Sequence, residues 1–93
     1  MGFADEDWIG TFNPIIDIDK LKYIDFNDKL RELSKKLKNE EKCDLVFALN
    51  HVRAPDDRKM AATNLCPDVL DMIFGGHDHS YLSELNYDTG VYI

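Results

Sequence analysis

The hydrophobic positions of the chain become regular after Asp25, where they recur at spacings of four, three and four residues: Phe26, Leu30, Leu33 and Leu37. This spacing places them on one face of a helix, with a solvated face of lysines, Arg31 and Glu32 opposite. Asp25 or Asn27 can cap the start of the helix, and the lysines gather towards its end, where the helix dipole favours cations. The pattern therefore predicts one long amphipathic helix.

Two short apolar runs follow and predict strands. They are LVFAL at 45–49 and VLDMIF at 69–74, and each ends in polar residues or glycines. Continuous apolar runs of this length are typical of parallel strands that are covered on both faces. We therefore expect two neighbouring parallel strands, both buried.

The segment between these strands predicts a short helix that starts at Pro55, with Asp56, Asp57, Arg58 and Lys59 capping and solvating it. After the second strand, residues 81–93 alternate around Asp88-Thr89-Gly90, which predicts an antiparallel hairpin. Residues 1–24 show no clear period, and IIDIDK at 15–20 favours a loop or a short exposed strand. The order of helix, strand, short helix, strand and hairpin indicates one α/β domain over 1–93.

Two strands with apolar faces need cover on both sides, yet the chain offers one long helix. A two-stranded sheet is not stable alone, and its edges would be exposed. We therefore expect the 93 residues to be a fragment or a subunit of a larger domain, which needs its missing part.

Composition limits the possible functions. The chain has 44% hydrophobic and 31% charged residues, as in globular proteins, and a net charge of −7, which argues against nucleic-acid binding. We find neither a membrane-spanning run nor a signal peptide, so the cytoplasm is the default expectation. A phosphate site in so acidic a chain needs its own positive charge, such as a divalent ion. Cys43 and Cys66 are too few for a disulfide framework and are expected to be small buried hydrophobes.

All three histidines follow a predicted strand. His51 comes two residues after the first, and His77 and His79 come after the second, behind two glycines that allow a sharp turn. Ligands bind at the carboxyl ends of strands in open parallel sheets, so the three imidazoles can converge on a divalent metal ion. A single histidine at such a place is usually a solvated loop residue, but the joint pattern favours ligands.

Neighbouring polar residues have weaker assignments. Asn50 is either an ordinary strand-end residue or a contact to substrate or water, and Arg53 is either a surface residue or a bidentate phosphate contact. Asp78 lies between two histidines in an extended segment and is expected to point away from them. Ser80 and the cysteines lack the surroundings of a catalytic nucleophile.

The stretches LVFALNHVR and LDMIFGGHDHSY, with the helix before them and GFADEDW, resemble the C-terminal part of the catalytic domain of calcineurin-like metallophosphoesterases, in the 5′-nucleotidase branch. The resemblance implies an α/β sandwich that hydrolyses phosphate monoesters such as nucleotides. It implies two divalent metal ions (Zn, Mn, Fe or similar), with His51 and His77 binding one and His79 the other.

The family also needs an Asp-x-His element, a bridging Asp, and an Asn-His pair that supplies the catalytic acid. The first two are not in the chain, and Asn50 does not replace the Asn of the pair, because it directly precedes His51 in a different motif. We therefore assign no catalytic residue and expect little or no activity from this chain alone. The alternative is a non-catalytic α/β module that binds a metal ion or a partner.

Overall fold

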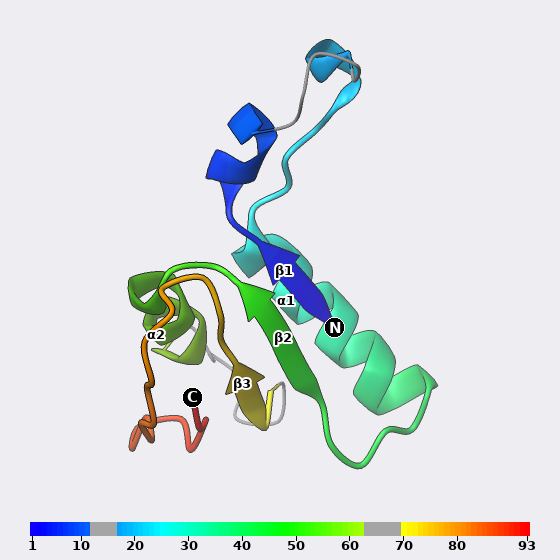
Figure 1. Cartoon of the computed structure of the whole chain (residues 1–93). Helices are drawn as coiled ribbons and strands as arrows, with labels where there is room; N and C mark the ends of the chain where they lie inside the picture. Colours follow the sequence, from blue (N-terminus) through cyan, green and yellow to red (C-terminus); the bar gives the residue numbers. More distant parts are fainter. Residues whose placement is uncertain (12–16, 63–69) are drawn as a thin grey trace.

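A three-stranded parallel sheet forms the centre of the molecule in the computed structural model, which describes residues 1–11, 17–62 and 70–93 (Figure 1). Its strands lie in the order β1 (Gly2–Ala4), β2 (Phe47–His51) and β3 (Met72–Phe74). Phe3 is opposite Asn50, and Ala48 is opposite Ile73. The predicted pair of parallel strands is confirmed, and β1 adds a third strand that the sequence pattern did not indicate.

The long amphipathic helix is confirmed as α1 (Phe26–Lys35), which continues into a π-helical turn η3 (Lys36–Glu40). Asp25 is its cap, and its carboxylate accepts a hydrogen bond of 2.8 Å from the N–H of Asn27. The buried side chains of α1 are Phe26, Leu30 and Ser34. Leu33 and Leu37 are only partly buried, so the line of closest packing follows a four-residue spacing along one side of the predicted face.

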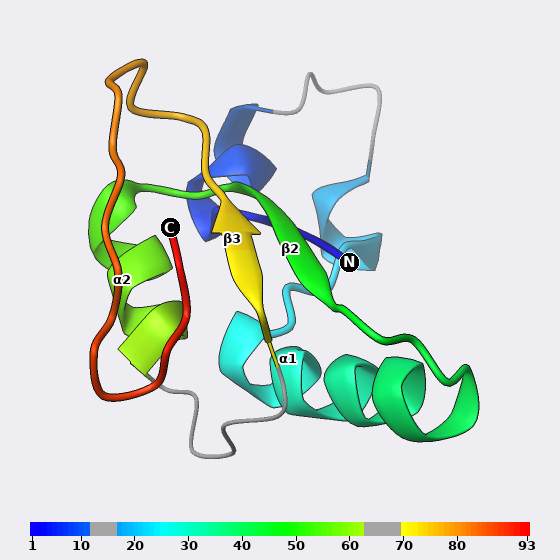
Figure 2. The same ribbon diagram turned by 90° about the horizontal axis from the view of Figure 1, so that it is seen from below.

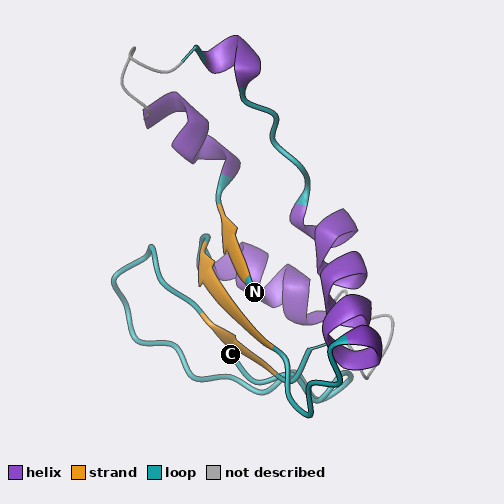
Figure 3. Ribbon diagram, turned by 90° about the vertical axis from the view of Figure 1, so that its right-hand side faces the viewer, coloured by secondary structure: helices purple, strands orange, loops and turns teal. Residues whose placement is uncertain are grey.

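The crossover between β2 and β3 contains the second helix, α2 (Ala54–Ala62), as the start at Pro55 predicted. Both helices lie on the same side of the strands (Figure 3) and share one core with the inward side chains of the sheet. That core includes Leu30 from α1, Met60 from α2 and Ile73 from β3, which are at most 2% exposed.

The opposite face of the sheet is bare. Leu45, Leu49 and Phe74 on that side are 61%, 68% and 48% exposed. The prediction that both strand faces are buried is therefore wrong for the described chain. Successive side chains of a strand point to opposite faces, and both helices pack against only one of them.

The first part of the chain forms β1 and two 3₁₀ turns, η1 (Glu6–Thr11) and η2 (Ile18–Lys20), which extend beyond the end of the sheet (Figure 1). The alternative of an exposed strand at 15–20 is wrong where the chain is described, since residues 18–20 are helical; positions 15 and 16 lie outside the described residues. β1 has only three residues, too few for a period to be read.

The predicted hairpin is confirmed at the C-terminus, where Glu84 and Ile93 exchange two backbone hydrogen bonds of 2.8 and 3.0 Å. Gly90 adopts a positive φ of 75° in its turn. The chain leaves the sheet after β3, returns along α2 and ends beside β3 (Figure 2), where the N–H of Ile73 donates to the carbonyl of Tyr92.

Cys43 is partly buried against the core, while Cys66 lies outside the described residues. In the described parts of the chain, no helix has the length and apolar character needed to cross a membrane.

Candidate functional site

Two of the three histidines meet at the carboxyl end of the sheet. His51 is the last residue of β2, and His77 follows the neighbouring strand β3 by three residues. Their ring centroids are 5.2 Å apart with the rings tilted by 53°. His51 is exposed and His77 is partly buried, so both imidazoles are accessible at the rim.

The loop that carries His77 and His79 turns sharply and passes close to β2. His77 and His79 both have positive φ angles, of 74° and 53°. A Cβ atom at Gly76 would lie 3.2 Å from the carbonyl oxygen of Asn50 and 3.6 Å from Nδ1 of His51. The glycine therefore permits a close approach of this loop to the end of β2, as the Gly-Gly pair predicted.

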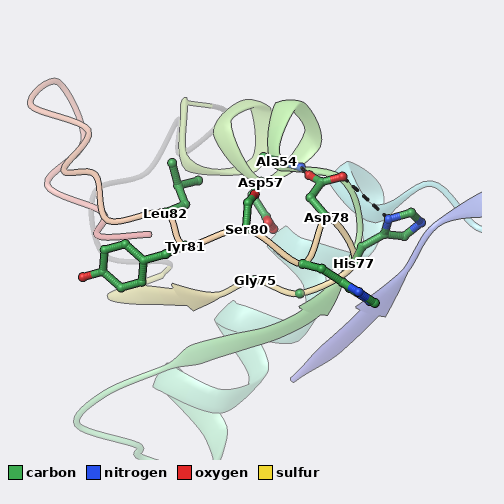
Figure 4. Close-up of a pocket in the computed structure, with 10 residues that line it drawn as sticks. Ala54, Asp57, Gly75, His77, Asp78, Ser80, Tyr81 and Leu82 are labelled. Atoms are coloured by element: carbon green, nitrogen blue, oxygen red, sulfur yellow. Dashed lines mark hydrogen bonds and ion pairs between the residues drawn. The ribbon is translucent and has the colours of Figure 1, made fainter.

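Asp78 turns towards α2. Its carboxylate accepts a hydrogen bond of 2.6 Å from the backbone N–H of Ala54, and its other oxygen is 3.7 Å from Nδ1 of His77 (Figure 4). A side-chain oxygen on an N–H of the first helical turn is the usual form of an N-terminal cap. Asp78 thus links the histidine loop to the start of α2.

Asp57 is buried, with 2% of its surface exposed, so the prediction that it solvates the helix is wrong. Position 57 faces inward because it lies one turn before the core residues Met60 and Ala61. Its Oδ1 accepts a hydrogen bond of 2.7 Å from the amide of Asn50, which is itself buried. Burial raises the pKa of Asp57; the bond from Asn50 opposes this, and the charges of Asp78 and Asp56 add to it.

Arg53 follows His51 by two residues and is held by acids of the N-terminal segment. Its guanidinium lies 3.3 Å from Oδ2 of Asp7 and 3.8 Å from Oδ2 of Asp5. The indole of Trp8 contacts His51 edge-on, with ring centroids 4.9 Å apart. The sequence pattern assigned no role to Trp8, and it placed Asp57 on the solvated side of the helix rather than in the core. An aromatic residue after the acids of the GFADEDW segment was the available signal for Trp8.

A cavity of about 340 Å³ opens between α2 and the histidine loop (Figure 4). Ala54 and Asp57 line it from the helix, and residues 75–82 line it from the loop. Among these lining residues there is no lysine or arginine. The cavity therefore carries the carboxylate of Asp57 on its helix side, and Asp78 and two imidazoles on its loop side.

Imidazole nitrogens suit zinc, manganese and iron ions, so His51 and His77 fit the donor type of a divalent metal site. Within residues 1–11, 17–62 and 70–93, no group of three or more His, Cys, Asp or Glu side chains is arranged to hold an ion. The described chain thus provides a pair of imidazoles rather than a complete ligand set. Ligand roles for the three histidines, and substrate contacts for Asn50 and Arg53, stay predictions.

Comparison with known proteins adds a second line of evidence. The chain is 38% identical over 63 residues to a protein named apyrase from Tabanus yao, a match that covers 68% of this chain and 11% of the apyrase. It is 30% identical over 78 residues to Protein 5NUC from Lutzomyia longipalpis, which covers 80% of this chain and 13% of that protein.

The chain therefore spans 11–13% of the length of these curated relatives. No protein-family model matches the sequence. No solved structure matches the chain significantly. The two similarities are consistent with a fragment related to the 5′-nucleotidase family, in agreement with the resemblance of the histidine motifs.

Proposed function

We propose that this chain forms one wall of the active site of a nucleotide phosphoesterase, which hydrolyses phosphate monoesters in the manner of 5′-nucleotidases. The observation that carries the proposal is the pair His51 and His77, whose rings lie 5.2 Å apart at the ends of adjacent parallel strands. The similarity to an apyrase and to Protein 5NUC supports a nucleotide as the substrate class.

The charge of the chain favours metal-assisted binding of a phosphate. The net charge is −7, and Arg53, the candidate phosphate contact, is already engaged with Asp5 and Asp7. A phosphate at the rim would therefore meet repulsion unless a cation is present. His51, His77 and His79 are the residues that would hold divalent ions here, and such ions supply Lewis-acid stabilisation of phosphoryl charge.

The chain is proposed to be inactive by itself, because it has neither the Asp-x-His element nor the bridging Asp of the family. Asn50 does not supply the Asn of the catalytic Asn-His pair, because it directly precedes His51 in a different motif. A purified 93-residue chain should hydrolyse no nucleoside monophosphate measurably with zinc or manganese present. Metal-dependent hydrolysis above a no-protein blank, lost in a His51→Ala variant, would contradict this part of the proposal.

Metal binding tests the site directly. Titration with Co²⁺, followed by visible absorption and calorimetry, should show binding to the wild type that falls about tenfold or more in His51→Ala and in His77→Ala. Glu41→Gln, at an exposed acid near the end of η3, is the control and should bind as the wild type does. Equal, negligible binding in wild type and both alanine variants would overturn the metal site.

The bare face of the sheet favours a second candidate, a non-catalytic module that binds a partner. Phe47 and Phe74 stack edge-to-face there, with centroids 5.7 Å apart, beside the exposed Leu45 and Leu49. Exposed apolar patches of this kind mark interaction surfaces. Sedimentation analysis of the wild type and Leu45→Ser/Leu49→Ser, together with the Co²⁺ titration, separates the two candidates. Metal binding without association favours the enzyme fragment. Association without metal binding favours the module.

A further inference from the structure

We infer that the buried pair Asn50–Asp57 is the positioning device that holds the histidine loop in place, so that His77 lies beside His51. The inference rests on the proposed function for its consequence, since it assigns the pair a role in shaping the metal site. It assigns neither residue as a ligand. The device consists of one hydrogen-bonded side-chain pair beneath the loop and one glycine, Gly75, that lies against it.

The first step is the contact between Asp57 and Gly75. A Cβ atom at position 75 would lie 2.5 Å from Oδ2 of Asp57 and 3.4 Å from its Cγ. Real Cβ atoms essentially never approach an oxygen so closely, so the carboxylate occupies the space that a side chain at 75 would need. The backbone of the loop therefore rests directly on the carboxylate, at the point where β3 ends.

The second step is the fixation of Asp57 itself. Its Oδ1 accepts the 2.7 Å bond from Asn50 Nδ2, and both residues are buried, at 2% and 6% exposure. Asn50 immediately precedes His51 in β2, and its carbonyl oxygen is the atom nearest to a Cβ at Gly76. One residue thus contacts the loop through its backbone and fixes, through its side chain, the carboxylate on which the loop rests.

The third step is the backbone of the loop. The left-handed conformations of His77 and His79 are uncommon for residues with a side chain and persist only where the surroundings hold them. Asp78 binds the loop to Ala54 from the outer side, while Asp57 supports it from the inner side. Both supports come from the first turns of α2, so the loop is held against one rigid element.

The test is a matched pair of glycine substitutions. Gly75→Ala should displace the loop and weaken Co²⁺ binding by about tenfold to a hundredfold, the usual effect of disturbing residues that orient ligands. Gly10→Ala, where nothing lies within 4 Å of the added Cβ, should leave binding unchanged. Adding Asp57→Ser to Gly75→Ala clears the carboxylate and keeps an oxygen for Asn50, and should restore most of the affinity.

A second readout, without metal, separates this inference from the proposed function. In the wild type, nuclear Overhauser contacts between the rings of His51 and His77 should be visible; Gly75→Ala should lose them, and Gly75→Ala/Asp57→Ser should regain them. Circular dichroism checks that each variant keeps its helices. If wild type binds no Co²⁺ but the ring contacts behave as stated, the metal site fails and the positioning role stands. Ring contacts and affinity that survive Gly75→Ala would overturn the positioning role, and so would a double variant that stays as impaired as Gly75→Ala.

Discussion

The two faces of the central sheet have similar hydrophobic residues but opposite environments. On the covered face, Val46, Ala48 and Ile73 are at most 2% exposed beneath α1 and α2. On the bare face, Leu49 and Phe74 are 68% and 48% exposed, although each is the direct neighbour of a buried residue. The sequence of the strands does not show which face is buried. The two helices decide this, because both lie on one side of the sheet.

The sheet has more hydrophobic surface than α1 and α2 cover. A parallel sheet is normally covered on both sides. The bare face is therefore a hydrophobic surface that further protein structure or a partner can cover. The candidate site lies at the carboxyl end of the same strands, next to both faces.

The largest expected effect comes from truncating one residue on each face of two neighbouring strands. Ile73→Ala removes a buried side chain and should lower the free energy of unfolding by about 2–5 kcal/mol. Leu49→Ala on the bare face should change it by about 0.5 kcal/mol or less, as at ordinary surface positions. Urea unfolding followed by circular dichroism measures both. Equal losses at the two positions would mean that the bare face is covered in solution.

Next in size is a pH effect at the covered face, from Asp57. Burial raises its pKa above the ordinary value of 3.8, so the folded chain holds this proton more tightly than the unfolded chain does. Its contribution to stability is therefore fully present below pH 3.8 and is lost as the pH rises through the raised pKa. Asp57→Asn has no titratable carboxyl at this position. The free energy of unfolding of the wild type, taken relative to that of Asp57→Asn, should therefore fall as the pH rises through this window.

Three neighbouring side chains also affect the pKa of Asp57 and must stay unchanged in the comparison. Asn50 donates to its carboxylate, and the charges of Asp78 and Asp56 favour its protonated form. Unfolding curves of the wild type and Asp57→Asn at several pH values, in one buffer series, give the difference directly. A difference that is flat, or that grows in favour of the wild type with rising pH, would contradict the burial of this carboxylate.

A smaller effect is expected at Asp71, which ties the start of β3 to β2 and η3. Burial acts to raise its pKa, but the 2.7 Å bond from the Val46 N–H and the 2.9 Å pair with Lys38 outweigh burial, so the pKa is lowered. Asp71→Ala should cost about 1 kcal/mol near neutral pH, and this loss should shrink as the pH falls. The stability contributed by Asp57 and that contributed by Asp71 should therefore change in opposite directions with pH, because one carboxyl is buried and the other is half-exposed and paired.

The smallest effect is expected for the exposed pair of Arg58 and Glu84, which joins α2 to the hairpin through two contacts of 2.8 Å. Exposed ion pairs contribute little and are screened by salt. Arg58→Ala should have an unfolding midpoint that merges with the wild type in high salt. A midpoint difference that persists there would show that this pair is more than a surface contact.

Local pattern predicted the elements that local forces decide. The spacing of Phe26 and Leu30, the cap at Asp25 and the turn before Gly90 are all set within a few residues, and the structure has each of them. The side of the sheet that the helices cover, the added strand β1 and the burial of Asp57 depend on contacts between distant segments. A local pattern of hydrophobic and polar residues does not predict contacts between distant segments.

The same distinction holds for the candidate site. The strand order predicted that all three histidines would converge, and the structure records a ring contact for one pair of them, His51 and His77. The contacts of Trp8 with His51 and of Asp5 with Arg53 come from residues more than 40 positions away in the sequence. Such contacts follow from the pairing of β1 with β2. β1 has only three residues, which is too short for a sequence pattern to predict this pairing.

The cap of α2 also affects the order in which the molecule can fold. Its N-terminal N–H, at Ala54, is bound by a carboxylate 24 residues further along the chain. A helix of nine residues is marginal alone and gains about 1 kcal/mol from a good cap. The first turn of α2 therefore gains this cap only when the loop after β3 has turned back towards it. Opening of the loop would leave the N–H of Ala54 without this carboxylate, so the stability of the helix start is coupled to the position of the histidine loop.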